Sequence, residues 1–194
     1  MRGDLWVTGD AAADELVNTD PTALLIGMLL DQQYPIEWAF AGPARLRDRL
    51  GHLDVARLAE MPEADLVAAA TTKPAIHRWG AMMGRRIHAM AQAIVEVYDG
   101  DPERIWAGAA DAADLKRRLR ALPGFGDEKA MMFVAVLAKR FGVRPAGWQV
   151  VAGPFADDQP RTVADAASPE ALARVREWKR AQRAAGRTKQ DAAI

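Results

Sequence analysis

Residues 122–130 read Leu122-Pro123-Gly124-Phe125-Gly126-Asp127-Glu128-Lys129-Ala130. The run lies between residues 113–121 and 131–141, which both carry apolar residues at helical spacing, so the sequence predicts a tight hairpin between two helices. Gly124 and Gly126 permit the positive φ angles and the close backbone approach that a side chain would block. The second helix would begin with unpaired N–H groups and the positive end of its dipole, which together bind anions. We therefore expect a phosphate site here. The alternative is an ordinary αα-hairpin in which the glycines only cap and turn.

The rest of the chain also has helical patterns. Asp20-Pro21 is typical of an N-cap followed by proline in the first turn, and it predicts a helix to about Leu30 that is apolar almost all round and therefore central and buried. Ser168-Pro169-Glu170 begins the last predicted helix in the same way. Between them, helices are expected at residues 35–41, 43–50, 54–60, 62–70 and 81–98, followed by a short one that ends near residue 107.

The predicted fold class is all-α, because no segment shows a convincing strand pattern. The expected organisation is a single domain over residues 1–194. Its parts are a helical lobe (22–110), the two-helix hairpin (113–141), an irregular loop rich in proline and glycine (142–167), and a basic C-terminal helix and tail (168–194).

Composition excludes several kinds of chemistry. The chain has 194 residues, half of them apolar, and no cysteine, so a disulfide, a cysteine nucleophile and an iron–sulfur cluster held by cysteines are impossible. His77 and His88 flank a group of arginines, which is more typical of a surface or phosphate-contacting cluster than of a metal site. We see neither a signal peptide nor an apolar run of membrane-spanning length, and we expect a cytoplasmic protein with no cofactor.

Charge is balanced in total but not along the chain. The sequence holds 26 basic and 26 acidic residues; acids prevail over residues 1–20, and bases prevail over residues 174–189. The basic end could follow a phosphate backbone, or it could be a solvated helix face and tail.

A second motif lies about a hundred residues before the hairpin. The hairpin run, together with Ala23-Leu24-Leu25-Ile26-Gly27-Met28-Leu29-Leu30-Asp31-Gln32-Gln33, resembles the helix-hairpin-helix GPD superfamily of base-excision DNA glycosylases, relatives of endonuclease III and the alkyladenine glycosylases. The resemblance covers roughly residues 20 to 145. It implies a two-lobed helical glycosylase-like fold, double-stranded DNA with a damaged or modified base as the partner, and a place with the nucleoid. The sequence does not give the oligomeric state, and we expect a monomer.

The resemblance also implies roles for individual residues. Gln32 and Gln33 would face the minor groove, where an amide can fill the gap that a flipped base leaves. Lys129 would be either a phosphate contact or the lysine whose amine attacks the sugar; the neighbouring acids Asp127 and Glu128 would raise its pKa and so oppose the second role. The residues expected to contact DNA are Gln32, Gln33, Arg85, Arg86, Leu122, Gly124, Gly126 and Lys129.

One expected group is missing. The aspartate that the superfamily carries after the second hairpin helix should lie within residues 143–150, where this chain has Gly147 or Trp148 instead. The replacement carboxylates considered are Asp31, Asp157 and Asp158. The absence leaves two other interpretations open, a DNA-binding module that recognises lesions without catalysis and a helical protein-interaction domain with no DNA role.

Aromatic residues beside the two motifs are candidates for holding a flipped base by stacking. Tyr34, Trp38 and Trp148 are the residues expected in a base pocket, whereas Trp106 is expected in the core.

Overall fold

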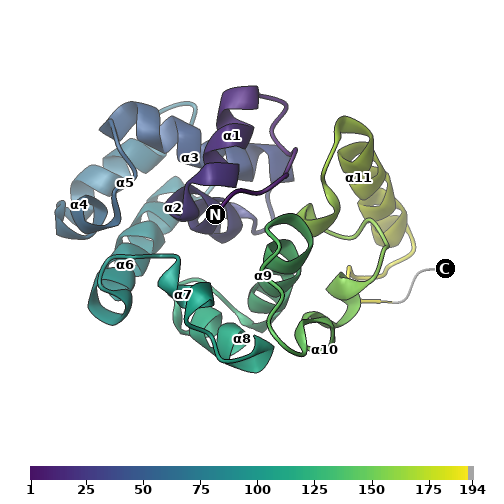
Figure 1. Ribbon diagram of the computed structural model, residues 1–194. Helices are drawn as coiled ribbons and strands as arrows, with labels where there is room; N and C mark the ends of the chain where they lie inside the picture. The colour runs from purple at the N-terminus through teal and green to yellow at the C-terminus, as the bar shows by residue number, and fades with distance from the viewer. Residues whose placement is uncertain (192–194) are drawn as a thin grey trace.

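The computed structural model describes residues 1–191, and within them all regular structure is helical, with no strand (Figure 1). The predicted all-α class is confirmed. In chain order the helices are α1 (Ala11–Thr19), α2 (Pro21–Leu30), α3 (Ile36–Leu50), α4 (Val55–Glu60), α5 (Glu63–Thr71), α6 (Gly80–Tyr98), α7 (Arg104–Ala107), α8 (Ala112–Ala121), α9 (Asp127–Arg140), α10 (Trp148–Ala152), the 3-10 helices η1 (Gly153–Ala156) and η2 (Val163–Asp165), and α11 (Pro169–Ala184). Over residues 1–191, none of these helices has the length and hydropathy to cross a bilayer.

Helix α2 is the centre of the molecule, as its sequence predicts. The Asp20 carboxylate accepts hydrogen bonds from the amides of Thr22 (2.8 Å) and Ala23 (3.2 Å), and every residue from 22 to 30 is buried. Helix α3 crosses α2 closely, because a Cβ on Gly27 would lie 2.8 Å from the Phe40 ring. Packing against α3 therefore fixes the last turn of α2, which directly precedes Asp31.

Three element predictions differ from the structure. Residues 36–50 form one helix, because Pro43 removes only one backbone hydrogen bond while the buried face of α3 continues past it on α2. Helix α9 begins at Asp127 rather than near residue 131, since acids favour the first turn of a helix. The loop predicted over residues 142–167 contains α10, η1 and η2.

The acidic N-terminal segment forms a helix that the sequence analysis missed. Asp10 caps α1 by accepting hydrogen bonds from the amides of Ala12 (2.8 Å) and Ala13 (3.0 Å). Asp14 is buried and accepts from the amide of Thr8 at 2.9 Å. Part of the negative charge at this end is therefore used to fold the first helix.

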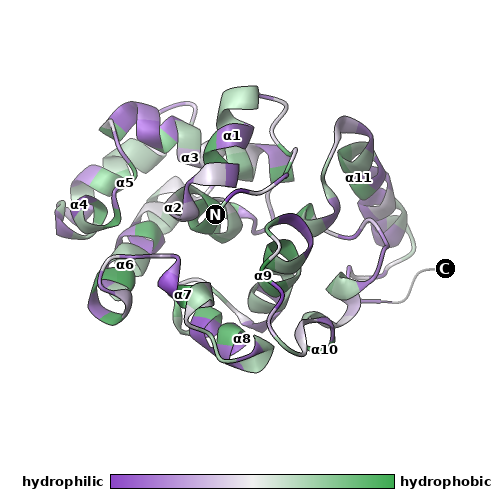
Figure 2. Ribbon diagram, viewed as in Figure 1, coloured by the Kyte–Doolittle hydropathy of each residue, from purple (hydrophilic) through white to green (hydrophobic). Residues whose placement is uncertain are grey.

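Helix α9 forms the second apolar centre. Residues 132–138 of α9 are all buried, and Trp106 lies in the core as predicted, with its ring 6.1 Å from that of Phe133. Figure 2 shows α2 and α9 predominantly green, whereas the outer face of α11 is largely hydrophilic. In Figure 1, α11 lies on the side of α9 opposite to α4, α5 and α6. Helix α11 packs on η2, and its Leu172 and Val175 are buried. This arrangement leaves room between α11 and the start of α9.

Candidate functional site

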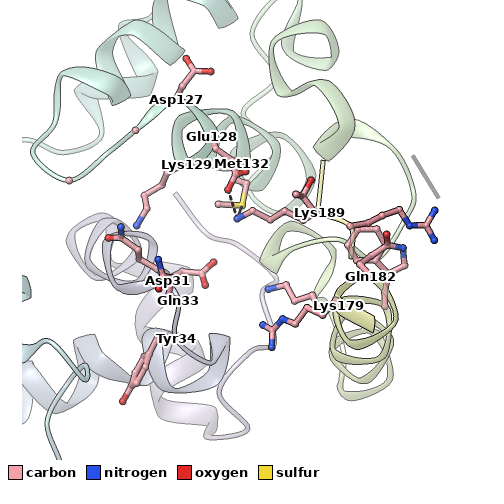
Figure 3. Close-up of a pocket in the computed structure, with 17 residues that line it drawn as sticks. Asp31, Gln33, Tyr34, Asp127, Glu128, Lys129, Met132, Lys179, Gln182 and Lys189 are labelled. Atoms are coloured by element: carbon pink, nitrogen blue, oxygen red, sulfur yellow. Dashed lines mark hydrogen bonds and ion pairs between the residues drawn. The ribbon is translucent and has the colours of Figure 1, made fainter. Parts of the chain in front are cut away.

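A cleft of about 570 Å³ lies where the end of α2, the start of α9 and the end of α11 meet (Figure 3). Its walls come from residues 31–34, residues 124–132 and residues 178–189, and we call this space the central cleft. Of the residues predicted from the sequence, the central cleft brings together Asp31, Gln32, Gln33, Tyr34, Gly124, Gly126 and Lys129. The two motifs, about a hundred residues apart in the sequence, therefore face the same space.

The connection between α8 and α9 is docked on the end of α2. Gly124 has φ +86°, and a Cβ there would lie 2.4 Å from Cδ1 of buried Leu29, so this position requires glycine. Gly126 has φ −83°, and a Cβ there would meet nothing within 4 Å. The prediction of a positive φ is correct for Gly124 and wrong for Gly126. The lack of a side chain at Gly126 only leaves the backbone at the start of α9 accessible.

The backbone amides at this bend are available to a ligand. Phe125 donates to the carbonyl of Leu122 at 3.1 Å, but among residues 1–191 the amides of Gly124, Gly126 and Asp127 have no acceptor. Gly126 and Asp127 are exposed. The start of α9 thus presents unpaired N–H groups and the positive end of its dipole to the surface beside the central cleft.

The acids in the first turn of α9 are neutralised by partners. Asp127 pairs with Lys116 (3.0 Å) and Arg120 (3.4 Å), and Glu128 pairs with Lys189 (2.7 Å). Partial burial acts to raise the pKa of Glu128, but bonds from Lys189 and Gln190 outweigh it and hold the pKa below its ordinary value. These two carboxylates therefore oppose an anion at the helix start less than the sequence suggests.

Lys129 points inward and links α9 to α2. It is 8 % exposed, and its Nζ donates to the carbonyls of Met28 and Leu29, both at 2.7 Å. These carbonyls belong to the last turn of α2, where a helix leaves acceptors without intrahelical donors, so Lys129 caps that helix.

Burial is the largest influence on the pKa of Lys129. Removal from water lowers its pKa from 10.5 to about 8, while the charge of Asp31 acts in the opposite direction. The prediction that Asp127 and Glu128 raise this pKa is wrong, because those carboxylates are paired with other cations.

Asp31 is the candidate carboxylate that reaches the central cleft. It ends α2, and among residues 1–191 its side chain has neither a hydrogen bond nor an ion pair. Its charge acts on the pKa of both Lys129 and Lys179, and Figure 3 shows it between those side chains. The lowered pKa values of these two lysines beside one cleft are a feature that is more common at functional sites than elsewhere.

The other two candidate carboxylates lie outside the central cleft. Asp157 is bound by the guanidinium of buried Arg161, with an N–O distance of 2.7 Å. Partial burial acts to raise the pKa of Asp157, but the bonds from Arg161 keep it below its ordinary value. Asp158 is exposed, and neither residue lines the central cleft. They were candidates only as carboxylates of the irregular loop that follows the hairpin, and the sequence pattern does not predict how that loop folds.

The glutamine pair is held in place by basic side chains. The side-chain oxygen of Gln32 accepts from Nη1 of Arg86 at 2.8 Å, and that of Gln33 accepts from Nη2 of Arg78 at 3.0 Å. Gln33 adopts φ +51°, a conformation that non-glycine residues take up mostly at constrained sites. Arg86 therefore holds the segment of Gln32 and Gln33 in position. Arg85 is exposed and lies outside the central cleft.

His77 also holds the segment of Gln32 and Gln33 in position. It is 1 % exposed, its Nδ1 accepts from the amide of Trp79 at 3.1 Å, and its Nε2 lies 3.1 Å from the carbonyl of Gln32. The proton must therefore sit on Nε2, which donates to Gln32. Burial lowers the pKa of His77, so the neutral ring is favoured. Tyr34 packs on this ring with 4.4 Å between centroids. This histidine is structural, not a phosphate contact.

Only one of the predicted pocket aromatics lines the central cleft. Tyr34 does, but Trp38 is 49 % exposed and stacks with the guanidinium of Arg45 at 4.9 Å. Trp148 is partly buried at the start of α10 and lies away from the central cleft.

Helix α11 supplies the lining residues that the sequence analysis missed. Trp178 and Gln182 are four residues apart, as are Lys179 and Arg183, and all four line the central cleft. Gln182 is 4 % exposed, and its Oε1 has no donor among residues 1–191. The i, i+4 spacing of large polar and aromatic residues was visible in the sequence, but nothing there indicated which face turns inward.

Residues 1–191 contain no cluster of three or more metal-ligating side chains. No family model, no curated protein and no solved structure matches the chain. Function is therefore inferred from the central cleft itself.

Proposed function

We propose that this protein is a base-excision DNA repair glycosylase, which binds double-stranded DNA and cleaves the N-glycosidic bond of a damaged or modified base. The observation that carries the proposal is the meeting of the two motifs around a free carboxylate, Asp31, in one cleft. A two-lobed glycosylase-like fold with a helix-hairpin-helix motif is part of the proposal. So are a monomeric state and a cytoplasmic, nucleoid-associated location.

The grip on DNA is assigned to the start of α9. The free amides of Gly124, Gly126 and Asp127 would donate to a phosphate, as helix starts do to anions. Cationic side chains surround the same space, namely Lys179, Arg183, Arg187 and Lys189. A chain with no net charge can thus present a basic surface where the strand would run.

The chemistry is assigned to Asp31. Breaking an N-glycosidic bond needs a carboxylate that stabilises the developing positive charge on the sugar or activates a water. Asp31 has no competing partner among residues 1–191, whereas Asp157 is held by Arg161. Gln33, beside it, would enter the space that the flipped base leaves. Lys129, whose amine is already bound to two carbonyls, would hold the bend against α2.

The test compares base release with binding. Duplexes carrying uracil, alkylated or oxidised bases are incubated with the protein, and free base and duplex affinity are both measured. Asp31→Asn should reduce release by at least about 100-fold, a typical contribution of one acid–base group, and leave affinity nearly unchanged. Asp158→Asn is the matched control and should behave as the unaltered protein, because Asp158 is exposed away from the central cleft.

A second candidate function is a lesion-recognising module without catalysis. It is favoured by one observation, the absence of any carboxylate in residues 143–150. Salt-dependent duplex binding with no base release, unaltered by Asp31→Asn, would select it over the glycosylase. If affinity for duplex DNA is absent at low salt, both DNA functions are excluded.

A further inference from the structure

Residues 186–191 turn back from the end of α11 toward α9, and we call this segment the strap. Gly186 has φ +66° and redirects the chain where α11 ends. The strap residues that line the central cleft are Arg187, Thr188 and Lys189. Figure 3 shows the Lys189 side chain extending to Glu128 at the start of α9. The strap therefore connects two walls of the central cleft.

Polar contacts hold the strap in its closed position. Its sequence, Gly-Arg-Thr-Lys-Gln-Asp, contains no apolar side chain, so closure gains little from the hydrophobic effect. Lys189 pairs with Glu128 at 2.7 Å, and Gln190 donates to the same carboxylate. Buried Arg161 donates to the carbonyl of Lys189 at 3.1 Å and to that of Asp191. Partly exposed ion pairs contribute little free energy, so the closed position is only marginally stable.

Closure also leaves polar groups without partners. The strap begins beside Gln182, whose carbonyl accepts from the Arg187 amide at 2.9 Å. Oε1 of Gln182 and Nε of Arg187 are buried, and within residues 1–191 neither has a hydrogen-bond partner. Burying a polar atom without a partner costs free energy, and this cost is recovered when the strap opens and water reaches these atoms.

The closed strap brings cations together as well. Burial lowers the pKa of Lys179 and of Lys129, and the charge of Lys189 acts in the same direction on both, whereas Asp31 acts against it. Arg187, also on the strap, lines the same space. Repulsion among these charges opposes closure, and an anion placed among them would turn the repulsion into attraction.

We propose that the strap closes over a phosphate group bound at the start of α9, and that strap closure and phosphate binding stabilise each other. This inference rests on the proposed function, since the phosphate is taken to belong to a DNA strand. The free amides of Gly126 and Asp127 donate to the phosphate from α9, and Arg187 and Lys189 approach it from the strap. The pair with Lys189 also neutralises Glu128, a carboxylate of the same helix turn that repels the anion when the strap is open.

The coupling is reciprocal. A ligand that binds more tightly to the closed strap shifts the strap toward its closed position by the same factor. An open strap withdraws two cations from the central cleft and uncovers the charge of Glu128, so it weakens the hold on DNA. The strap thereby regulates the rate at which DNA dissociates.

Limited digestion with trypsin measures how often the strap is open. Trypsin must take the Lys189 side chain into its own pocket, which requires that side chain to leave Glu128. The rate of cleavage after Lys189, followed by mass spectrometry, therefore reports the population of the open strap. Inorganic phosphate and a duplex carrying one uracil should each slow this cleavage at least about 5-fold, the lower end of typical coupling between sites. A small peptide substrate checks that trypsin itself is unaffected.

The Gly186→Ala variant separates strap closure from simple shielding by bound DNA. Alanine resists φ +66°, but its Cβ would meet nothing within 4 Å, and Gly186 does not line the central cleft. We expect cleavage after Lys189 to be about 5-fold faster without ligand, and duplex affinity to be weaker by up to the same factor. The matched control is Gly51→Ala, which changes the left-handed glycine after α3, also with open space around it, and should behave as the unaltered protein.

Faster cleavage in the presence of either ligand would overturn the inference, because strap and phosphate would then compete. So would a duplex that binds without slowing cleavage, or an unchanged duplex affinity in Gly186→Ala; in these cases the proposed DNA function stands and only the role of the strap is lost. If no duplex binds, the proposed function fails. Protection by inorganic phosphate would then still support the strap as a clamp on a smaller phosphate ligand, and its absence would exclude the strap.

Discussion

The two sides of the central cleft are built in different ways. On the side formed by α2 and α9, residues 22–30 and 132–138 are buried, and the one buried cation, Lys129, has two carbonyl acceptors. On the side formed by α11 and the tail, Lys179 and Gln182 have polar atoms without partners among residues 1–191. The interior of the first side is satisfied by its own fold, and its free groups, the Asp31 carboxylate and the amides at the start of α9, lie only at its edge on the central cleft. The second side has partnerless polar side chains along the face of α11 itself.

The C-terminal tail, on the α11 side, is attached to the rest of the molecule by polar contacts. Lys189 meets α9 through Glu128 at 2.7 Å and the sulfur of Met132 at 3.3 Å. Buried Arg161 holds the backbone near the end of the described chain by donating to the carbonyl of Lys189 at 3.1 Å. Contacts of this polar kind are individually weak and depend on salt, so the α11 side is expected to adjust to a ligand more readily than the α2–α9 side.

The largest effect is expected from removing the Lys129 amine, which links α9 to α2. Lys129→Met should lower the free energy of unfolding by about 3 kcal/mol, because two buried carbonyls lose their donor. Urea denaturation measures the change. Lys179→Met is the matched control on the other side and should change stability by less than about 0.5 kcal/mol. Equal losses in the two variants would remove the distinction between the sides.

A smaller effect is expected at the bend itself. Gly124→Ala should cost about 2 kcal/mol of unfolding free energy, because alanine would have to adopt φ +86° and its Cβ would press on Leu29 at 2.4 Å. Gly126→Ala should leave stability nearly unchanged, since its Cβ would meet nothing within 4 Å. The second variant should instead weaken duplex binding, if a phosphate approaches that open side. Thermal unfolding and duplex titration of both variants check the pair.

The smallest effect concerns pH. The pKa of Lys129 is lowered to about 8 in the folded protein by burial, with Lys189 and Arg86 acting in the same direction and Asp31 against them. Above pH 8 the folded protein therefore binds fewer protons than the unfolded chain, so stability due to this group rises as pH rises, up to about pH 10. The free energy of unfolding should gain about 1 kcal/mol between pH 8 and pH 9, relative to Lys129→Met measured under the same conditions. A flat difference over that interval would show that the amine is not desolvated.

The sequence located most helices because their signals are local. Asp20-Pro21 and Ser168-Pro169 mark the starts of α2 and α11 correctly, and the continuous apolar run of residues 23–30 gives the central helix. It missed α1 and divided α3 at Pro43, because in both places tertiary packing or capping outweighs the local preference.

The candidate site divides in the same way. The motif residues Asp31, Gln32, Gln33, Gly124, Gly126 and Lys129 were found from their order and do line one cleft. Trp38 and Trp148 were predicted as aromatic residues beside the motifs, and Asp157 and Asp158 as carboxylates of the irregular loop, but all four lie outside the central cleft. Lys179 and Gln182 were missed, since helical spacing shows that two residues share a face but not what that face meets.

By itself, the amino-acid sequence determined the helical class, the central position of α2 and the bend at Gly124, because periodicity, caps and glycine act over a few residues. Only the tertiary structure decided which carboxylate is free, which lysine is committed to backbone carbonyls and which is left facing a cleft. Those properties depend on distances between segments about a hundred residues apart in the chain, and on the removal of water that occurs when the segments pack.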